Sequence, residues 1–422
     1  MKRIILACVL ASLLAGPLLA CTPGAIGSRP EPVSLRFAYR AGGIQIESLL
    51  DEFHDQYPHI TVEPIAVTSA SDLRQRVAQG QVDLLRDNRE ALALVRQDLL
   101  RPLDDMHLAE WDTIRADYYR GLWESLAIGG QQWGIPAGLD IMALYVNMDA
   151  VRALGLRLPA SGETWDAFAF LELANALNDP DGLSDPLDTR MFGFCTDPEQ
   201  WDLFFIIYAW GGRIVDDLND PQRPMLDQNE TIEAARWYTE LFTRYGVAPM
   251  PAVIRRTYAG GVGQAFISGH CGLWMGQYSN RGGLGSSYTW AADWEMLPLP
   301  RLNGDWTLAD VEGYYVTATS EYPQEALTLA RFLSGHPLAS GALAPPRRAL
   351  AADSAFERAV GSQVADRARE ISDQIIMVPA DLSPELMVVG EAVFIAINRS
   401  IQEDLDVELL LLDAQQQLER GN

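Results

Sequence analysis

The sequence predicts an α/β fold with parallel β-sheets, divided between two domains. After residue 33, short apolar segments with strand spacing alternate with amphipathic segments of helical spacing, which is the order that βαβ units produce. The chain has 422 residues, 48% of them hydrophobic, and this exceeds what a single hydrophobic core normally organises. In such sheets ligands bind in the loops after the carboxyl ends of strands, so functional side chains are expected there.

The first elements follow this alternation in order. Strands are predicted over residues 34–40, 60–67 and 82–85. Between the first two lies a predicted helix over 44–58, which carries its apolar side chains on one face and ends at Pro58. At the other end of the chain, the segments 385–401 and 407–420 have apolar stripes at helical spacing and are predicted to be packing helices.

The front of the chain predicts export. It opens MKR, continues as an apolar run and reaches LLAC at residues 18–21, which is typical of a secretory signal peptide over residues 1–20. LLAC also resembles the lipobox of bacterial lipoproteins, in which the Cys, here Cys21, is acylated; the alternative is an ordinary signal with a chance Cys. Residues 21–33 are rich in Pro, Gly and Ser and are expected to form a tether. We therefore expect an extracytoplasmic protein that a lipid anchor attaches to the cell membrane.

Charge, cysteines and missing motifs exclude several function classes. A formal net charge of −25 argues against binding to nucleic acid or anionic lipid. Outside the cytoplasm Cys195 and Cys271 could form a disulfide, although sequence leaves their pairing open. The five His residues have no ligand spacing, and the sequence contains no HExxH, CxxC, GxSxG or P-loop motif. We therefore predict no metal site, no cofactor and no catalytic residue.

Several stretches of the chain carry a family resemblance by their order. They are residues 53–64, 133–168, 210–216 with 231–249, 265–279, 295–304, 312–320 and 344–350. The second stretch contains the landmarks G-x-P, Tyr-x-Asn, Gly-Leu, Pro and Thr-Trp in that order. In this order the chain resembles extracellular solute-binding proteins of sugar ABC importers, the maltose-binding-like group of family 1 solute-binding lipoproteins.

The resemblance implies a two-lobed periplasmic-binding-protein fold of the class II type, with the ligand in a cleft between the lobes. The chain would cross between lobes after Leu139, near 297–300 and near 318–321. The first lobe is then expected over 34–142 plus 297–318, and the second over 143–296 plus 319–422. The implied function is the substrate-binding component of an ABC importer, a monomer that binds a mono- or oligosaccharide and delivers it to a membrane permease.

One carboxylate interrupts an otherwise apolar segment. Asp140 lies within the small and apolar run that follows Pro136, at the place where the resembling group directs an acidic residue into the cleft. A carboxylate there can accept hydrogen bonds from adjacent sugar hydroxyls. The alternative for Asp140 is a helix cap or a hinge salt bridge with an Arg.

Further ligand-binding candidates come from predicted strand ends. Asp87 and Asn88 follow a strand, and for both the alternative is an N-cap on the following helical segment. Aromatic rings suit the apolar face of a pyranose, and polar neighbours suit its rim. Trp165 is expected in the core. The other candidates are Tyr39, Arg40, Glu199, Trp201, Gln277 and Tyr278, with Glu312, Tyr314 and Arg347 further out.

Two other functions stay open at this point. The same fold could bind a polyol, a sugar phosphate or a polyamine. An anionic ligand would need several convergent Arg side chains, and only Arg40 and the pair Arg347 and Arg348 are obvious. A secreted glycan hydrolase would need two carboxylates across the cleft, for which Asp140 and Glu199 are the candidates.

Overall fold

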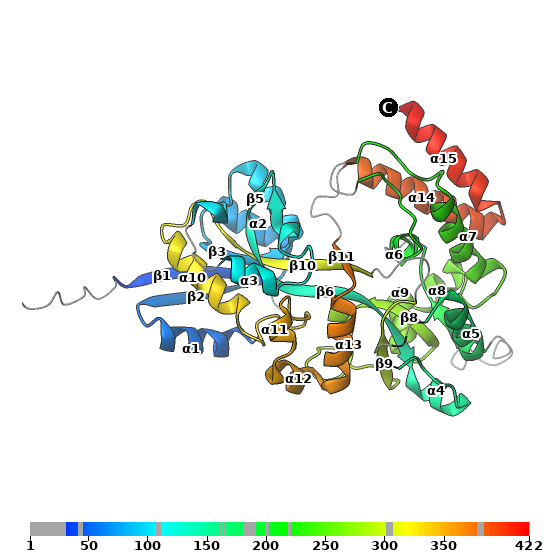
Figure 1. Cartoon of the computed structure of the whole chain (residues 1–422), viewed down its shortest axis with the longest axis horizontal. Helices are drawn as coiled ribbons and strands as arrows, with labels where there is room; N and C mark the ends of the chain where they lie inside the picture. The colour runs from blue at the N-terminus through cyan, green and yellow to red at the C-terminus, as the bar shows by residue number, and fades with distance from the viewer. Residues whose placement is uncertain are drawn as a thin grey trace, which may run out of the picture.

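One mixed β-sheet runs through the part of the molecule that the structure, a computed structural model, describes (Figure 1). The described residues are 31–40, 45–106, 111–160, 163, 165–179, 191–198, 202–217, 221–300, 307–377 and 384–421. Seven of the nine strands lie in the order β2-β1-β3-β10-β6-β8-β7, while β11 pairs with β10 and β9 with β6. The strands are β1 Val33–Arg40, β2 Ile60–Val67, β3 Leu84–Asn88, β6 Gly134–Asn147, β7 Phe192–Cys195, β8 Cys271–Gln277, β9 Trp294–Leu297, β10 Thr307–Val316 and β11 Ile375–Met377, and β4 Ala127–Ile128 pairs separately with β5 Gln131–Gln132.

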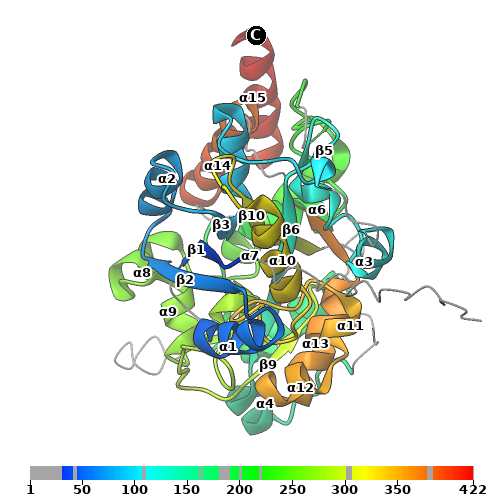
Figure 2. The ribbon, with the colours of Figure 1, turned by 90° about the vertical axis from the view of Figure 1, so that its left-hand side faces the viewer.

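Helices cover both faces of this sheet. Figure 2 shows α1 and α2 on opposite sides of β1 and β2, and α10 contacts α1 as well as β1, β3, β6 and β10. The α-helices are α1 Ile46–Gln56, α2 Ala70–Ala78, α3 Trp111–Asp117, α4 Met148–Leu154, α5 Ala167–Leu177, α6 Asp202–Ala209, α7 Asn229–Thr243, α8 Pro251–Thr257, α9 Gly261–Ile267, α10 Pro323–Ser334, α11 Arg348–Ala351, α12 Ser354–Val360, α13 Ser362–Ser372, α14 Pro384–Glu403 and α15 Val407–Gly421. Short 3-10 helices are η1 Arg89–Gln97, η2 Leu103–Asp105, η3 Glu124–Leu126 and η6 Tyr278–Asn280.

Local sequence explains where several elements begin and end. In α1 the buried side chains are those of the predicted apolar face, and the helix ends just before Pro58. The side chain of Asn147 accepts hydrogen bonds from two backbone N–H groups at the start of α4, and α4 ends at Gly155, whose φ of 65° favours glycine. In α14 and α15 the predicted stripes are buried against each other and against α7. Both are packing helices, as predicted.

The expectation of parallel sheets was wrong in one respect. β1 pairs in parallel with β2 and β3, but β10 runs antiparallel to both β3 and β6. β10 lies between two strands that precede it by far in the sequence, and local apolar spacing carries no information about such a distant insertion. The sheet is therefore mixed.

The longest strand, β6, changes partners along its length. Residues up to Ile141 pair with β10, whereas residues from Met142 onward pair with β8 and β9. All of its residues except Asp140 are buried, because neighbours cover it on both edges and both faces. Asp140 therefore lies one residue before the change of partner.

The buried apolar side chains form two hydrophobic cores, and β6 contributes to both. The first contains β1, β3, β10, α10 and the first half of β6, and also Ala143 and Tyr145 beyond the change, while the second contains Met142, Leu144 and Val146 of β6 together with α5, α7 and α14. The predicted lobe boundaries stay a prediction, although α10, which the prediction gave to the second lobe, packs on strands of the first. None of the helices in the described ranges has the length and hydropathy that a bilayer crossing requires.

Candidate functional site

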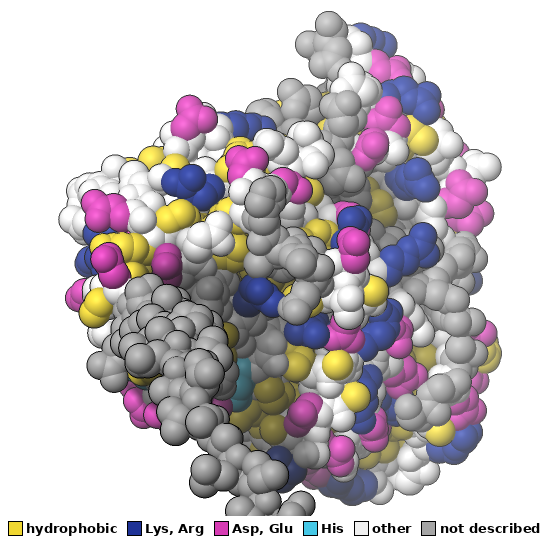
Figure 3. Space-filling view, turned by 60° about the vertical axis from the view of Figure 1, so that its left-hand side comes forward, with side chains coloured by type: hydrophobic (Ala, Val, Ile, Leu, Met, Phe, Trp, Pro, Cys, Tyr) yellow, Lys and Arg dark blue, Asp and Glu magenta, His cyan; other side chains and the backbone are white. Residues whose placement is uncertain are grey.

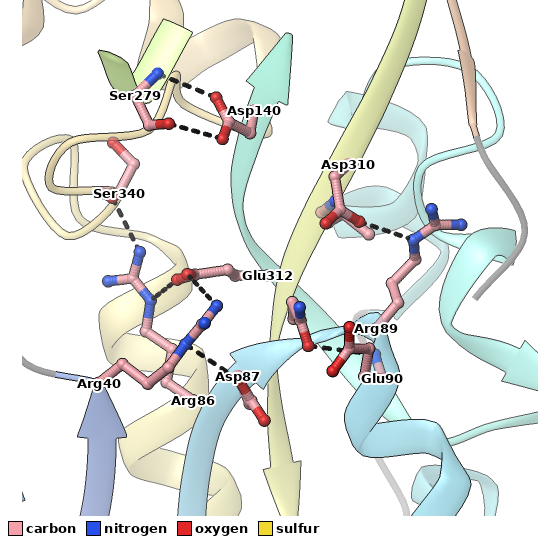
Figure 4. A network of polar contacts seen from close by, with 12 residues as sticks. Arg40, Arg86, Asp87, Arg89, Glu90, Asp140, Ser279, Asp310, Glu312 and Ser340 are labelled. Carbon is pink, nitrogen blue, oxygen red and sulfur yellow. Dashed lines mark hydrogen bonds and ion pairs between the residues drawn. The ribbon is translucent and has the colours of Figure 1, made fainter. Parts of the chain in front are cut away.

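Charged side chains gather where β1 and β3 end and β10 passes them. Tyr39 on β1 is in register with Arg86 on β3, so the next residues, Arg40 and Asp87, emerge together at the strand ends. The antiparallel β10 places Glu312 opposite Asn88. Figure 4 shows the resulting contacts. We name this group the strand-end network, and its members are Arg40, Arg86, Asp87, Arg89, Asp140, Asp310 and Glu312.

Arg40 joins two carboxylates of the strand-end network. Its guanidinium lies 3.2 Å from Asp87 Oδ1 and 3.5 Å from Glu312 Oε1. Asp87 is buried, and neither of its carboxylate oxygens has a hydrogen bond of good geometry. Burial raises the pKa of Asp87, and the nearby Arg40 opposes that rise. Arg40 is the most exposed of the three cations and covers Asp87 from the solvent side.

Two buried arginines hold the other carboxylates in place. Arg86 Nε donates to Glu312 Oε2 at 2.7 Å, and its two terminal nitrogens donate to the carbonyl oxygens of Ala339 and Ser340. Arg89 Nε donates to Asp310 Oδ1 at 3.0 Å. Because the arginines are buried while Asp310 and Glu312 are partly exposed, the carboxylates are the groups that reach solvent here.

Asp140 bonds to the segment that follows β8. Its Oδ1 accepts from the backbone N–H of Ser279 at 2.9 Å, and its Oδ2 accepts from the Ser279 hydroxyl at 2.8 Å (Figure 4). Asp140 is also in register with Asp310 on β10. Burial raises the pKa of Asp140 to about 6; the bonds from Ser279 lower it, and the charges of Asp310 and Glu312 raise it further. Within the described ranges, the structure gives Asp140 no cationic partner, so the predicted alternative of a salt bridge with Arg does not apply.

The predicted aromatic candidates lie deeper than a ligand platform would. Tyr278 and Tyr314 have 0% and 1% of their surface exposed, and buried arginines lie over both rings. Burial raises the pKa of each to about 12. Tyr39 is also buried and stacks on Phe37 with 5.5 Å between ring centroids. These three rings therefore offer no open face in this structure.

The remaining candidates lie apart from the strand-end network or have structural partners. Asn88 accepts a hydrogen bond from the N–H of Glu90 and caps η1, as the alternative for it proposed. The backbone oxygen of Gln277 accepts from the Tyr145 hydroxyl. Arg347 forms its own ion pair with Asp117, at 2.8 Å, where α11 meets the end of α3.

Trp165, Cys195 and Cys271 are all buried. Trp165 donates to the carbonyl of Pro298, as expected for a core residue. Cys195 and Cys271 are joined by a disulfide with 5.9 Å between their Cα atoms. The candidates Glu199 and Trp201 and the lipidation candidate Cys21 lie outside the described residues.

Sequence reasoning missed Arg86, Arg89 and Asp310. The first two belong to the run Arg86-Asp87-Asn88-Arg89, where the signal was an Arg on each side of a strand end, but their role depends on β10. Asp310 alternates with Glu312 along β10, and that period of two could have placed both carboxylates on one face.

This arrangement can bind a ligand that both accepts and donates hydrogen bonds. Among the described residues, three guanidinium groups face four carboxylates, so the charges nearly balance with a small excess of negative charge. Acidic and basic side chains are likewise interspersed over the face of the molecule in Figure 3. No group of three or more His, Cys, Asp or Glu side chains within the described part of the chain is placed to hold a metal ion.

Known proteins resemble this chain over most of its length. A family model described as bacterial extracellular solute-binding protein matches residues 41–338. An uncharacterized lipoprotein in the oleD 5' region of Streptomyces antibioticus is 30% identical over 181 residues, which is 41% of this chain and 38% of that protein. The match thus spans less than half of that relative.

Solved structures share the fold. The substrate-binding protein Lmo0181 from Listeria monocytogenes, in complex with cycloalternan, has a TM-score of 0.71 at 15% identity over 93% of this chain and 99% of that one. A cyclo/maltodextrin-binding protein complexed with maltotetraose has a TM-score of 0.70 at 20% identity, over 93% and 98%. UgpB from Mycobacterium tuberculosis, in complex with glycerophosphocholine, has a TM-score of 0.68 at 16% identity, over 91% and 97%. They confirm the predicted two-lobed α/β fold.

Proposed function

Because this chain belongs to the family of bacterial extracellular solute-binding proteins, we propose that it captures a neutral mono- or oligosaccharide for an ABC importer. The ligand binds in the cleft between the two lobes, and the closed complex delivers it to the importer's membrane permease. Members of this family are solute-binding proteins and not enzymes. The alternative of a secreted glycan hydrolase is therefore rejected.

The observation that carries this proposal is the strand-end network. Asp310, Glu312 and Arg40 are partly exposed beside the point where β6 changes partners, and each is held in place by an oppositely charged neighbour. Fixed carboxylates and guanidinium groups bind sugar hydroxyls well, because charge-assisted hydrogen bonds are stronger than neutral ones. Asp140 is proposed as a further acceptor, since each of its oxygens has room for bonds beyond the one from Ser279.

The charge balance favours a neutral ligand over an anionic one. Arg86 and Arg89 are buried and already bonded to carboxylates, so a phosphate would find only Arg40. It would also meet the excess negative charge of the strand-end network, and like charges in a poorly hydrated cleft repel strongly. A sugar phosphate is therefore disfavoured. A polyamine is not disfavoured by charge, but it would compete with the arginines that already pair with Asp310 and Glu312.

A thermal-shift panel tests the ligand class. The full chain is heated with maltotetraose, glucose, sorbitol, glycerol 3-phosphate and spermidine at equal concentrations. A ligand that binds only the folded state raises the unfolding temperature by mass action. We expect a shift from a neutral saccharide and none from the phosphate. Shifts from glycerol 3-phosphate or spermidine alone would contradict the proposal.

A matched pair of variants tests the site. Glu312→Gln removes a charged acceptor from the strand-end network, and Glu63→Gln removes one from the exposed face of β2. We expect the first variant to weaken binding by about 1.5–3 kcal/mol, the value of a charged hydrogen bond, and the second to leave it unchanged. Equal affinities for both variants would place the ligand elsewhere.

Lipid anchoring is the proposed means of keeping the protein at the membrane. LLAC and the Pro-, Gly- and Ser-rich residues 21–33 support it, and a disulfide between Cys195 and Cys271 fits an oxidising compartment outside the cytoplasm. We expect Cys21→Ala to abolish acylation and to release the protein from membranes. Wild-type amounts of this variant in the membrane fraction would refute the anchor.

A further inference from the structure

The loop of residues 339–344 connects the candidate site to the point where β6 changes partners. Arg86, whose Nε holds Glu312, donates from its other two nitrogens to the carbonyls of Ala339 and Ser340, at 2.7 Å and 2.8 Å. The guanidinium is buried, so these bonds are made without competition from water. One end of the loop is thereby fixed to β3 and, through Glu312, to β10.

The same loop also lies directly on β6. Leu139 and Ala344 exchange two backbone hydrogen bonds of 2.9 Å each. Gly138 makes this approach possible, because a Cβ on Gly138 would lie 2.7 Å from Cδ1 and 2.9 Å from Cβ of Leu343. The loop is therefore seated on the last residues of β6 that pair with β10.

A second buried arginine fixes the loop to the segment after β8. Arg281 has 1% of its surface exposed, and its Nη1 donates to the carbonyl of Ala342 at 2.7 Å. The same guanidinium donates to Tyr278 and Gly285 within its own segment and lies 4.0 Å over the Tyr278 ring. Two residues earlier, Ser279 bonds to Asp140 with its N–H and hydroxyl. The segment 278–285 is thus attached to the loop and to β6 at once.

These contacts form one continuous chain of polar bonds. It runs from Glu312 through Arg86 to the loop 339–344, from the loop through Arg281 to the segment 278–285, and from Ser279 back to Asp140. Glu312 lies on β10, which pairs with the first half of β6, and Arg86 on its neighbour β3, whereas the segment 278–285 continues from β8, which pairs with the second half of β6. The loop is the link between the two sides.

We propose that the loop 339–344 couples the strand-end network to the change of partner in β6, and that Arg281 is the positioning residue at its far end. This rests on the proposed function, because a ligand bond to Glu312 is what the relay would transmit. A ligand that pulls on Glu312 shifts Arg86, and through the loop it shifts the segment 278–285 against β6. The angle between the two halves of the molecule thereby follows the occupancy of the site.

Hydrogen–deuterium exchange on the full chain without ligand tests the relay. The perturbation is Glu312→Gln, which keeps the shape of the side chain and an oxygen acceptor for Arg86 Nε but removes the charge. The readout is the exchange rate of amides in 278–285, Ser279 above all. We expect exchange there to rise about threefold or more, a coupling in the range found between residues of one network. Glu63→Gln is the matched control and should leave these amides unchanged.

A double-mutant cycle then asks whether Arg281 carries the effect. Arg281→Lys keeps the charge but replaces the guanidinium, whose two terminal nitrogens reach three carbonyls, with a single ammonium nitrogen. If the relay exists, Glu312→Gln adds little to the exchange of 278–285 once Arg281→Lys is present. Additive effects, or a Glu312→Gln effect confined to β3 and β10, would overturn the inference. Because no ligand is used, a failure here is distinct from a failed ligand panel.

Discussion

Asp140 is the residue whose environment conflicts most with its charge. The strand-end network gives each of its other carboxylates an arginine, whereas Asp140 has only the two bonds from Ser279. Burial raises its pKa to about 6, above the value of about 3.9 expected in the unfolded chain. The folded state therefore holds a proton on Asp140 over a pH range where the unfolded chain has lost it.

The sign of the resulting pH dependence follows from linkage. Between about pH 4 and pH 6 the folded state binds more protons at this position, so the free energy of unfolding falls as pH rises through that window. Asp140→Asn cannot ionise and should lose this dependence. We expect the stability of the variant relative to wild type to improve by up to about 3 kcal/mol between pH 4 and pH 7, measured by urea unfolding.

An exposed acid supplies the control for this prediction. Asp55 lies on the exposed side of α1. For Asp55→Asn, the plot of the free energy of unfolding against pH should run nearly parallel to that of wild type. Parallel curves for Asp140→Asn as well would mean that Asp140 is solvated in the folded protein.

Arg86 is expected to contribute to stability as well as to the site. Replacement by Met would leave Glu312 without its Nε bond and two buried carbonyls without donors. Loss of one partner from a buried pair of this kind typically costs about 3–5 kcal/mol. Arg115→Met breaks a comparable pair with Glu124, in which both side chains are more than half exposed, and should cost about 1 kcal/mol or less. Denaturant midpoints compare the two, and similar losses would refute the role given to Arg86.

At the scale of single residues, the sequence predicts which charged residues belong to the candidate site better than it predicts which residues they pair with. Asp140 stood out because it interrupts a buried run, and Asp87 and Arg40 because they end strands. Arg86 and Arg89 could not be assigned a role, because their carboxylate partners come from β10, and Glu312 is 226 positions from Arg86. The sequence predicts Tyr278 and Tyr314 as ligand-binding residues, because it shows the aromatic side chains and not the arginines that lie over their rings.

Among the elements, local pattern predicted helices and strands where contacts between sequence neighbours decide them. The helix over 44–58 and the strands over 34–40 and 60–67 correspond to α1, β1 and β2. The strand predicted over 82–85 lies too early, because β3 runs from Leu84 to Asn88 and reaches Asn88 only where β10 pairs with it. The segment after it is the 3-10 helix η1, capped by Asn88. The pairing of strands that are distant in the sequence cannot be predicted from local sequence pattern.

β6 depends on a glycine where the loop 339–344 lies against it. Gly138→Ala would place a methyl group within 3 Å of two carbons of Leu343. We expect the loop to be displaced and the free energy of unfolding to fall by about 1–3 kcal/mol, as for overpacked cores. At Gly335 an added Cβ would come no closer than 3.3 Å to a neighbour, so Gly335→Ala is the milder control. Equal effects of the two variants on chemical unfolding would contradict this account of Gly138.

The disulfide that joins β7 to β8 crosses a sequence separation of 76 residues. Cross-links over loops of this length stabilise folded proteins by about 2–4 kcal/mol, chiefly by restricting the unfolded chain. The double variant Cys195→Ser with Cys271→Ser should lose about this much stability in guanidinium unfolding. Adding a reductant should destabilise wild type and leave the double variant unaffected. A reductant-insensitive wild type would show that the bridge is not formed.

For the molecule as a whole, size and alternation predicted two units of α/β structure, and the structure has two hydrophobic cores. The sequence could not show how they are joined. One strand, β6, belongs to both sides, and the loop 339–344 and the segment 278–285 meet beside its change of partner. Which residues move with which lobe depends on these contacts, and α10 illustrates this because it packs on strands far earlier in the chain.

The position of β10 also governs when the protein can fold. β10 is inserted between β3 and β6, yet the ribosome makes it long after both. Pairing between such distant segments is slow, because the entropy cost of closing a long loop comes before any stabilising hydrogen bond forms. We therefore expect the sheet to stay incomplete, with β3 and β6 lacking the strand that lies between them, until the chain has been made as far as Val316.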